Sequence, residues 1–139
     1  MSGAFTISAT IAQRKAPAHP EAFGLFIGGA NLDQPTQEYL YFLVRGDGKY
    51  MIKHRAGADV HTVTDWTDSP AVTKQNEAGA ASNAMAIAVT ATDVIFRANG
   101  KDVVSLKKSD MKGFKTDGIA GMRVNHNLDV HIADFAIAK

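Results

Sequence analysis

The feature that most constrains this chain is the alternation of apolar and polar residues with a period of two. In "AFTISATIAQ", Phe5, Ile7 and Ile11 alternate with threonine and serine residues. Because successive side chains of a β-strand point to opposite faces, this pattern is typical of a strand with one buried face. Residues 4–13 are therefore predicted to form a strand that covers a hydrophobic core.

Eight further segments of this kind follow, each bounded by glycine, asparagine, aspartate or proline residues that favour turns. They are residues 22–29, 39–45, 49–55, 83–90, 93–98, 101–106, 118–124 and 128–138. Residues 107–115 have a mild helical character, enough for a single turn. Nine short strands without a long helical segment predict an all-β fold, a sandwich or jelly roll of antiparallel sheets.

Composition limits the size of the domain and the class of partner. A length of 139 residues suits one domain with one core, so residues 1–139 are predicted to form a single domain. The net charge of +1 creates no strong field for nucleic acid or an anionic membrane. No apolar run approaches the roughly 18 residues of a membrane span. The absence of cysteine excludes disulfide bonds, thiolate zinc sites and a cysteine nucleophile.

Turn lengths can be inferred by asking which register places apolar side chains opposite one another. In "YLYFLVRGDGKYMIKHR", a three-residue loop over residues 46–48 satisfies this condition, whereas a two-residue turn does not. The predicted pairs are Phe42 with Ile52, Val44 with Tyr50, and Leu40 with His54. The opposite face then carries an aromatic and basic patch of Tyr39, Tyr41, Lys53 and Arg55.

Two more hairpins are predicted in the same way. Asn99-Gly100 is a strong two-residue turn signal, which pairs Arg97 with Asp102 and Phe96 with Val103. In "NHNLDVH", a turn over residues 125–127 places apolar residues of segments 118–124 and 128–138 opposite one another. The polar face of this third hairpin pairs Arg123 with Asp129 and Gly121 with His131. Asp134 interrupts the alternation, so a bulge is predicted near Ala133.

Four stretches that contain seven of these segments, taken in order, resemble the concanavalin A-like lectin/glucanase superfamily. They are "FGLFIGG", "YLYFLVRGDGKYMIKHRAG", "VIFRANGKDV" and "DGIAGMRVNHNLDVHIADFAI". The similarity is greatest to bacterial domains of the 3-keto-disaccharide hydrolase-like kind, related to family 16 glycoside hydrolases, and covers about residues 22–138. The resemblance implies a jelly roll of two antiparallel sheets, one face of which often binds glycans. It also implies a periplasmic or extracellular protein whose export signal is absent from this sequence. The residues Met1-Ser2-Gly3 are compatible with an expression leader in place of that signal.

The chain departs from the catalytic members of that superfamily. Family 16 hydrolases carry an E-x-D-x-x-E strand, whose glutamates act as nucleophile and acid/base. This chain has Glu21, Glu38 and Glu77, and none of them begins such a motif. No catalytic residue is therefore predicted, and a non-enzymatic protein is favoured over an enzyme.

Candidate ligand-binding residues combine aromatic rings that can stack on a sugar with polar groups that can orient it. They are Tyr39, Tyr41, Lys53, Arg55, Trp66, Arg123, Asn125, His126, Asp129 and His131. Each has a structural alternative: the tyrosines and cations can form a solvated sheet face, and Trp66 can close one end of the core. In the third hairpin His131 lies beside Gly121, so among the residues of "NHNLDVH" its side chain has the most free space for a ligand.

Metal ligation is weakly indicated. His126, Asp129 and His131 are suitable ligand types, but the hairpin separates them, and a divalent ion usually needs three or four converging groups. No metal or other cofactor is predicted. Calcium binding by loop carboxylates such as Asp33, Asp65 and Asp68 stays open, although none has a recognisable calcium spacing.

The sequence is therefore interpreted as a non-catalytic module that binds an oligo- or polysaccharide, with neither nucleic acid nor a membrane as partner. Two alternatives stay open. One is a glycoside-acting hydrolase with an atypical centre of Arg123, Asp129 and His131. The other is a structural β-sandwich domain that forms a homo-oligomer through a sheet face.

Overall fold

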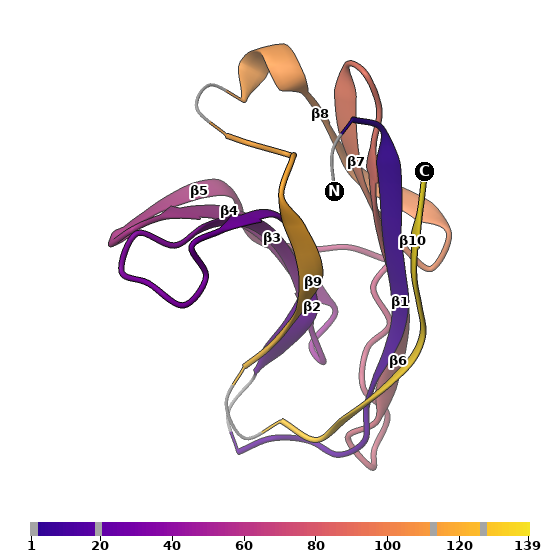
Figure 1. Ribbon diagram of the computed structural model, residues 1–139. Coiled ribbons are helices and arrows are strands. Elements are labelled where there is room, and N and C mark those ends of the chain that lie inside the picture. Colours follow the sequence, from indigo (N-terminus) through magenta and orange to yellow (C-terminus); the bar gives the residue numbers. More distant parts are fainter. Residues whose placement is uncertain (1–2, 19–20, 112–113, 126–127) are drawn as a thin grey trace.

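The structure is a computed structural model that describes residues 3–18, 21–111, 114–125 and 128–139. These residues form ten strands in two five-stranded antiparallel sheets that pack face to face (Figure 1). Sheet 1 has the order β10-β1-β6-β7-β8 and sheet 2 the order β5-β4-β3-β2-β9. The strands of sheet 1 are β1 (Phe5–Gln13), β6 (Ala81–Val89), β7 (Asp93–Ala98), β8 (Lys101–Lys107) and β10 (Val130–Ala138). Those of sheet 2 are β2 (Ala22–Ala30), β3 (Glu38–Arg45), β4 (Lys49–Ala56), β5 (Asp59–Asp68) and β9 (Ile119–Val124).

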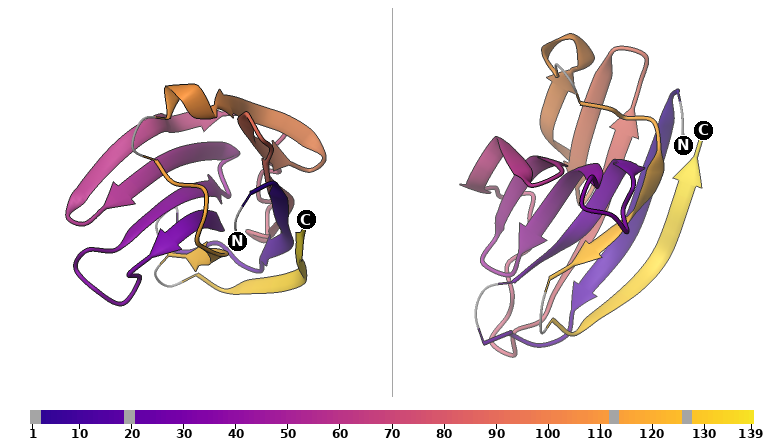
Figure 2. Two further views of the ribbon diagram at one scale, coloured as in Figure 1. Left: turned by 45° about the horizontal axis from the view of Figure 1, so that its top comes forward. Right: turned by 60° about the vertical axis from the view of Figure 1, so that its left-hand side comes forward.

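The chain crosses repeatedly between the sheets, so that strands distant in sequence become neighbours. In sheet 1, β1 lies between β10 and β6, and in sheet 2, β2 lies between β3 and β9 (Figure 2). Helical structure in the described residues is a single 3-10 turn, η1 (Lys108–Asp110), within the segment where a turn was predicted. The architecture confirms the prediction of an all-β jelly roll of two antiparallel sheets.

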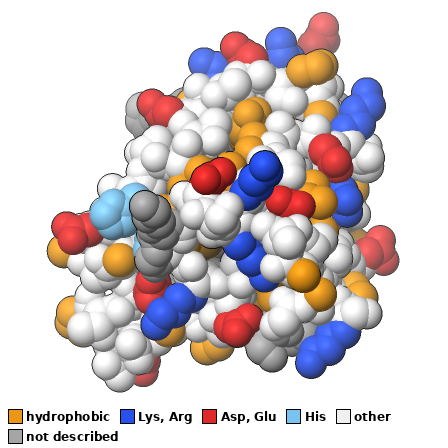
Figure 3. Space-filling view, turned by 90° about the horizontal axis from the view of Figure 1, so that it is seen from above, with side chains coloured by type: hydrophobic (Ala, Val, Ile, Leu, Met, Phe, Trp, Pro, Cys, Tyr) orange, Lys and Arg blue, Asp and Glu red, His pale blue; other side chains and the backbone are white. Residues whose placement is uncertain are grey.

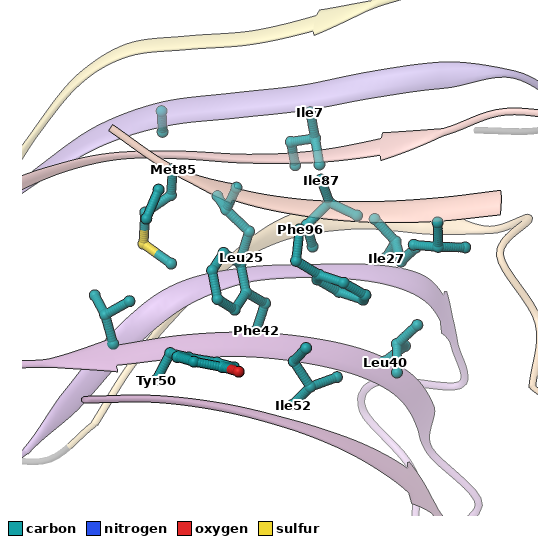
Figure 4. Close-up of a cluster of buried hydrophobic side chains, with 14 of the residues drawn as sticks. Ile7, Leu25, Ile27, Leu40, Phe42, Tyr50, Ile52, Met85, Ile87 and Phe96 are labelled. Carbon is teal, nitrogen blue, oxygen red and sulfur yellow. The ribbon is translucent and has the colours of Figure 1, made fainter. Parts of the chain in front are cut away.

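The core lies between the sheets and consists of the inward-facing residue of each alternating pair. In β1 the burial alternates at every position from Phe5 to Gln13, which is the period-two pattern expected of a half-buried strand. Phe42 of sheet 2 meets Phe96 of sheet 1 edge to face at a centroid distance of 5.4 Å. Isoleucine and leucine side chains from both sheets surround this pair (Figure 4).

The local hairpins form largely as predicted. Phe42 lies opposite Ile52, Val44 opposite Tyr50 and Leu40 opposite His54, across the predicted three-residue loop. In the second hairpin Arg97 lies opposite Asp102, as predicted, and bonds to it. The predicted pair of Phe96 with Val103 is wrong, because a register shift beside Arg97 places Phe96 opposite Val104.

The third predicted hairpin does not exist. Strand β9 pairs with β2 in sheet 2, whereas β10 pairs with β1 in sheet 1. The predicted pairs of Arg123 with Asp129 and of Gly121 with His131 are therefore wrong: Arg123 lies opposite Gly24, and His131 lies opposite Ala12. Each of these strands has an apolar face. Any neighbouring strand with the same alternation of apolar and polar residues can continue that face, so alternation alone does not identify the partner.

Two further features concern β5 and β10. Strand β5 was not predicted, because this edge strand is mostly exposed and polar, so Asp65 and Asp68 lie in a strand and not in a loop. The predicted bulge near Ala133 is confirmed, since the register between β1 and β10 shifts directly after Ala133 and Asp134 has a φ of 54°. A positive φ is more readily adopted by aspartate than by most residues.

Candidate functional site

The outer face of sheet 2, which points away from the core, carries an apolar cluster of its own. Tyr41, Leu43 and Met51 are buried there although they do not face sheet 1. Phe26, Tyr39 and Trp66 pack against them and stay partly exposed. We call this cluster the outer aromatic face. It arises because the second side of β3 carries Tyr39, Tyr41 and Leu43, and β4 adds Met51.

Two glycines seat the Phe26 ring at one side of this face. A Cβ atom on Gly121, which lies opposite Phe26 on β9, would come within 2.9 Å of the ring carbons Cε1 and Cζ. A Cβ atom on Gly29 would come within 3.1 Å of Cε2. The ring also meets Tyr39 edge to face at 5.7 Å. The space above Gly121, predicted to be open beside His131, is thus filled by Phe26.

Arg123 reaches from β9 across the face towards β3. Its Nη1 atom donates a hydrogen bond to the Tyr39 hydroxyl at 3.1 Å, and its guanidinium carbon lies 4.5 Å from the centre of the Tyr41 ring. The two tyrosine rings are 5.2 Å apart. The stacking on Tyr41 and the bond to Tyr39 together restrict the guanidinium to one orientation.

A pocket of about 430 Å³ opens beside these residues. Its lining is Phe26, Leu32, Gln37, Tyr39, Met122, Arg123, Val124 and Asn125. The volume falls in the range of small-molecule sites. Phe26 and Leu32 supply apolar surface, Gln37 and Asn125 supply amide groups, and Arg123 supplies a charge. Asn125 is held in place by a backbone hydrogen bond to Ala22 at 2.9 Å.

The far side of the outer aromatic face has a second arginine in a different state. The Arg45 guanidinium lies 4.1 Å over the Trp66 ring and is paired with Asp47 at 2.6 Å and 3.2 Å. Burial raises the pKa of the Asp47 carboxyl, but Arg45 and Lys49 outweigh this effect and hold the pKa below its ordinary value. The charge of Arg45 is therefore already neutralised, and one face of Trp66 is covered.

Lys53 and Arg55 continue the face on β4. Lys53 lies opposite Tyr41, and Arg55 lies opposite Tyr39 and donates a hydrogen bond from Nε to the Gly57 carbonyl at 3.1 Å. In the described part of the chain neither has an acidic partner. The structure thus places Tyr39, Tyr41, Lys53, Arg55, Trp66 and Arg123 on one face, with Asn125 at the pocket beside it.

The remaining predicted residues do not join this group. Asp129 and His131 are exposed at the beginning of β10, which belongs to sheet 1. The Asp129 carbonyl accepts a hydrogen bond from the Arg14 amide at 2.9 Å. His126 lies outside the described residues. The centre of Arg123, Asp129 and His131 is thus not assembled, because β9 and β10 belong to different sheets.

A separate titratable cluster lies on the inner side of sheet 2. His54 is 3% exposed, its Nε2 atom is 3.1 Å from Glu38 Oε2, and its ring stacks on Phe114 at 4.1 Å and on His61 at 5.7 Å. Burial lowers the pKa of His54, and His61 lowers it further, while Glu38 opposes both. The His54 Nδ1 atom has no partner among the described residues. We regard this cluster as part of the packing between sheet 2 and the segment before β9.

Among the described residues, neither the distribution of charged side chains nor a cluster of metal-ligand types marks a second site. The end of the molecule seen in Figure 3 has acidic and basic side chains intermixed. Within the described ranges, no three His, Asp or Glu side chains converge as metal ligands. No helix in the described part of the chain has the length and apolar character to cross a membrane.

Sequence reasoning missed the pocket residues Phe26, Leu32, Gln37, Met122 and Val124. A signal existed for Phe26: Leu25 and Ile27 lie on one side of an alternating strand, so the residue between them has to point to the other side. Leu32 and Gln37 belong to a loop whose position depends on tertiary structure. Met122 and Val124 were assigned to a hairpin that does not form.

Comparison with known proteins supports the fold and leaves the family open. No protein-family model matches the chain, and no curated protein matches it. Among solved structures, the chain is similar to sheep galectin-11 in a complex with glycerol, with a TM-score of 0.65 and 9% sequence identity. The match covers 99% of this chain and 91% of that one. At this identity the likeness concerns the fold alone, a jelly roll of two antiparallel sheets.

Proposed function

We propose that this protein is a non-catalytic carbohydrate-binding module whose site is the pocket beside the outer aromatic face. The observation that carries the proposal is the convergence of Phe26, Tyr39, Arg123 and Asn125 on one pocket of sugar size. Aromatic rings suit the C–H faces of a pyranose, while amides and a guanidinium suit its hydroxyl groups. Among the described residues the lining holds no carboxylate, whereas most glycoside hydrolases use a pair of them. Binding is therefore favoured over hydrolysis.

The fold supports this proposal because the neighbour at a TM-score of 0.65 is a galectin. The narrower similarity to bacterial 3-keto-disaccharide hydrolase-like domains, and a periplasmic or extracellular location, belong to the same proposal. A shared fold does not imply a shared ligand. Support for a sugar ligand therefore comes from the residues of the pocket.

A glycan array followed by calorimetry tests the proposal with a matched pair of variants. Phe26→Ala removes the ring beside the pocket, and Phe135→Ala removes an aromatic ring that is 43% exposed on sheet 1. We expect glycan binding to be lost in Phe26→Ala and retained in Phe135→Ala. The proposal is wrong if no glycan binds, or if both variants bind like the unchanged protein.

Self-association is a second candidate, favoured by the edge of sheet 1. Strand β10 exposes Ile132, Phe135 and Ile137 at 37%, 43% and 38%. Bulges such as the one at Asp134 are a common device against edge pairing, which places this candidate second. Light scattering of the unchanged protein and of Ile132→Lys tests it, since a concentration-dependent dimer that the variant abolishes would support it.

A further inference from the structure

We infer that the ligand of this pocket is an acidic sugar, whose carboxylate or sulfate group is bound by Arg123. The inference rests on the proposed function and names its ligand class. The observation behind it is the state of Arg123, which is a positioned cation in a pocket without an acid.

Arg123 is oriented but not neutralised. Its contacts with the protein are a hydrogen bond to the Tyr39 hydroxyl and stacking over Tyr41, and no acidic group pairs with it among the described residues. A phenol and an aromatic ring orient a guanidinium while leaving its charge available. Most of its N–H donors stay unused, in the planar fork that matches a carboxylate or sulfate in two parallel hydrogen bonds.

Of the other arginines on the two sheets, Arg45 and Arg97 are paired with acids, whereas Arg55 has no acidic partner among the described residues but does not line the pocket. Arg45 is paired with Asp47 at 2.6 Å, and Arg97 is paired with Asp102 at 2.7 Å. Each of these charges is compensated by a residue within a few positions in the sequence. Arg123 instead faces the pocket, the lining of which contains no aspartate or glutamate among the residues that the structure describes. Partial burial beside Phe26 and Tyr39 strengthens its attraction for an anion relative to that of a fully hydrated cation.

The neighbouring groups fit the same class of ligand. Because the Tyr39 oxygen accepts the bond from Arg123, the hydroxyl proton of Tyr39 is left to donate to a second ligand oxygen. Lys53 and Arg55 lie on the same face at β4, three strand spacings from β9. At about 4.8 Å per spacing, the cations span about 14 Å of the sheet. A chain of acidic sugars would contact Arg123 and Lys53 together.

The experiment compares acidic ligands with neutral counterparts that have the same sugar backbone. The probes are trigalacturonate against its full methyl ester, for carboxylate, and dextran sulfate against dextran, for sulfate. Binding is measured by calorimetry for the unchanged protein, Arg123→Gln, Arg123→Lys and the control Lys101→Gln. Lys101 is an exposed cation at the tip of the β7–β8 hairpin, and its loss changes the net charge equally. Urea unfolding of each variant verifies that it is folded.

We expect at least one acidic probe to bind about tenfold or more tightly than its neutral counterpart, as a charge-assisted bidentate contact would produce. Arg123→Gln should abolish this preference, Arg123→Lys should reduce it, and Lys101→Gln should retain it. Equal affinity for acidic and neutral probes, or a preference that survives Arg123→Gln, overturns the inference. An equal loss in Lys101→Gln also overturns it, because the attraction would then be unspecific.

The two proposals fail in different ways. Binding of neutral glycans that depends on Phe26, without any preference for acidic probes, overturns the acidic-sugar inference alone. Absence of binding to every glycan, charged or neutral, overturns the proposed function and this inference with it.

Discussion

Replacing Gly121 by alanine is predicted to displace the Phe26 ring and to couple the two positions energetically. The added Cβ would lie within 2.9 Å of two Phe26 ring carbons, so the ring has to move. It cannot move freely, because Gly29 approaches its other side and Tyr39 meets it edge to face. Such overpacking typically costs about 1–3 kcal/mol. Alanine also restricts the unfolded chain, which stabilises the folded state by about 0.4–1 kcal/mol.

The net effect of Gly121→Ala on the free energy of unfolding is therefore a loss of about 0–2.6 kcal/mol. When Phe26 is already alanine, the clash is absent, and Gly121→Ala should stabilise the protein by about 0.4–1 kcal/mol. The coupling energy between the two positions is the difference, about 1–3 kcal/mol. A large coupling would show that the glycine is required by the ring.

Urea denaturation of the unchanged protein, both single variants and the double variant measures this coupling. Glycan binding by Gly121→Ala provides a second measurement, and it should weaken because the pocket wall has moved. If Gly121→Ala has the same effect in both backgrounds, the ring does not occupy the space above Gly121, and the geometry of the pocket argued above is wrong.

Three other predictions concern a core phenylalanine, a buried histidine and an exposed ion pair. Phe42→Ala should lower the free energy of unfolding by about 3–5 kcal/mol, because it leaves a cavity against Phe96; urea denaturation measures it. Burial lowers the pKa of His54 below its ordinary 6.5 despite the opposing Glu38. The unfolded chain therefore binds the proton more readily, and stability should fall as the pH drops from 6.5 towards the folded pKa. The urea midpoint measured against pH should show this fall, and His54→Gln should reduce it. Asp102→Asn should change stability by less than about 1 kcal/mol, because its ion pair with Arg97 is exposed; a larger change in thermal unfolding would contradict this.

Local turn chemistry explains why the β3–β4 hairpin could be predicted in register. A loop of Gly46, Asp47 and Gly48 permits one pairing in which Val44 meets Tyr50, and the neighbouring registers place apolar residues on the solvent side. The residues that determine this register lie within about twenty positions of the sequence. The same reasoning located the Asn99-Gly100 turn but not the register shift beside Arg97, which no sequence signal indicates.

Pairing between distant strands could not be predicted in this way. Strand β9 pairs with β2 and β10 pairs with β1, at separations of about a hundred residues or more. An alternating strand satisfies its apolar face against any alternating neighbour, so proximity in sequence suggested a hairpin that does not form. Strand β5 was missed for another reason: it lies at an edge, and polar residues occupy most of its positions.

The candidate site contains residues placed by a local hairpin and residues placed by the pairing of distant strands. Tyr39, Tyr41, Lys53 and Arg55 share a face because of one local hairpin, and the hairpin register predicted that face. Phe26 and Arg123 come to it from β2 and β9, which requires the distant pairing. Alternation contains the signal that Phe26 points away from Leu25 and Ile27, but only the pairing of β2 with β3 and β9 places it between Tyr39 and Gly121.

Two predictions about Arg123 were wrong, its neighbouring strand and its ion pair with Asp129, and both followed from the β9–β10 hairpin that does not form. In a β9–β10 hairpin, Asp129 would have lain opposite Arg123 and neutralised it, and no unpaired cation would have faced a pocket. Because β9 instead joins sheet 2, Arg123 lies opposite Gly24 and extends over the tyrosines of β3. Glycine offers no side chain to compensate the charge, and tyrosine orients the guanidinium without removing it. The availability of Arg123 for an acidic ligand thus depends on which strand becomes its neighbour.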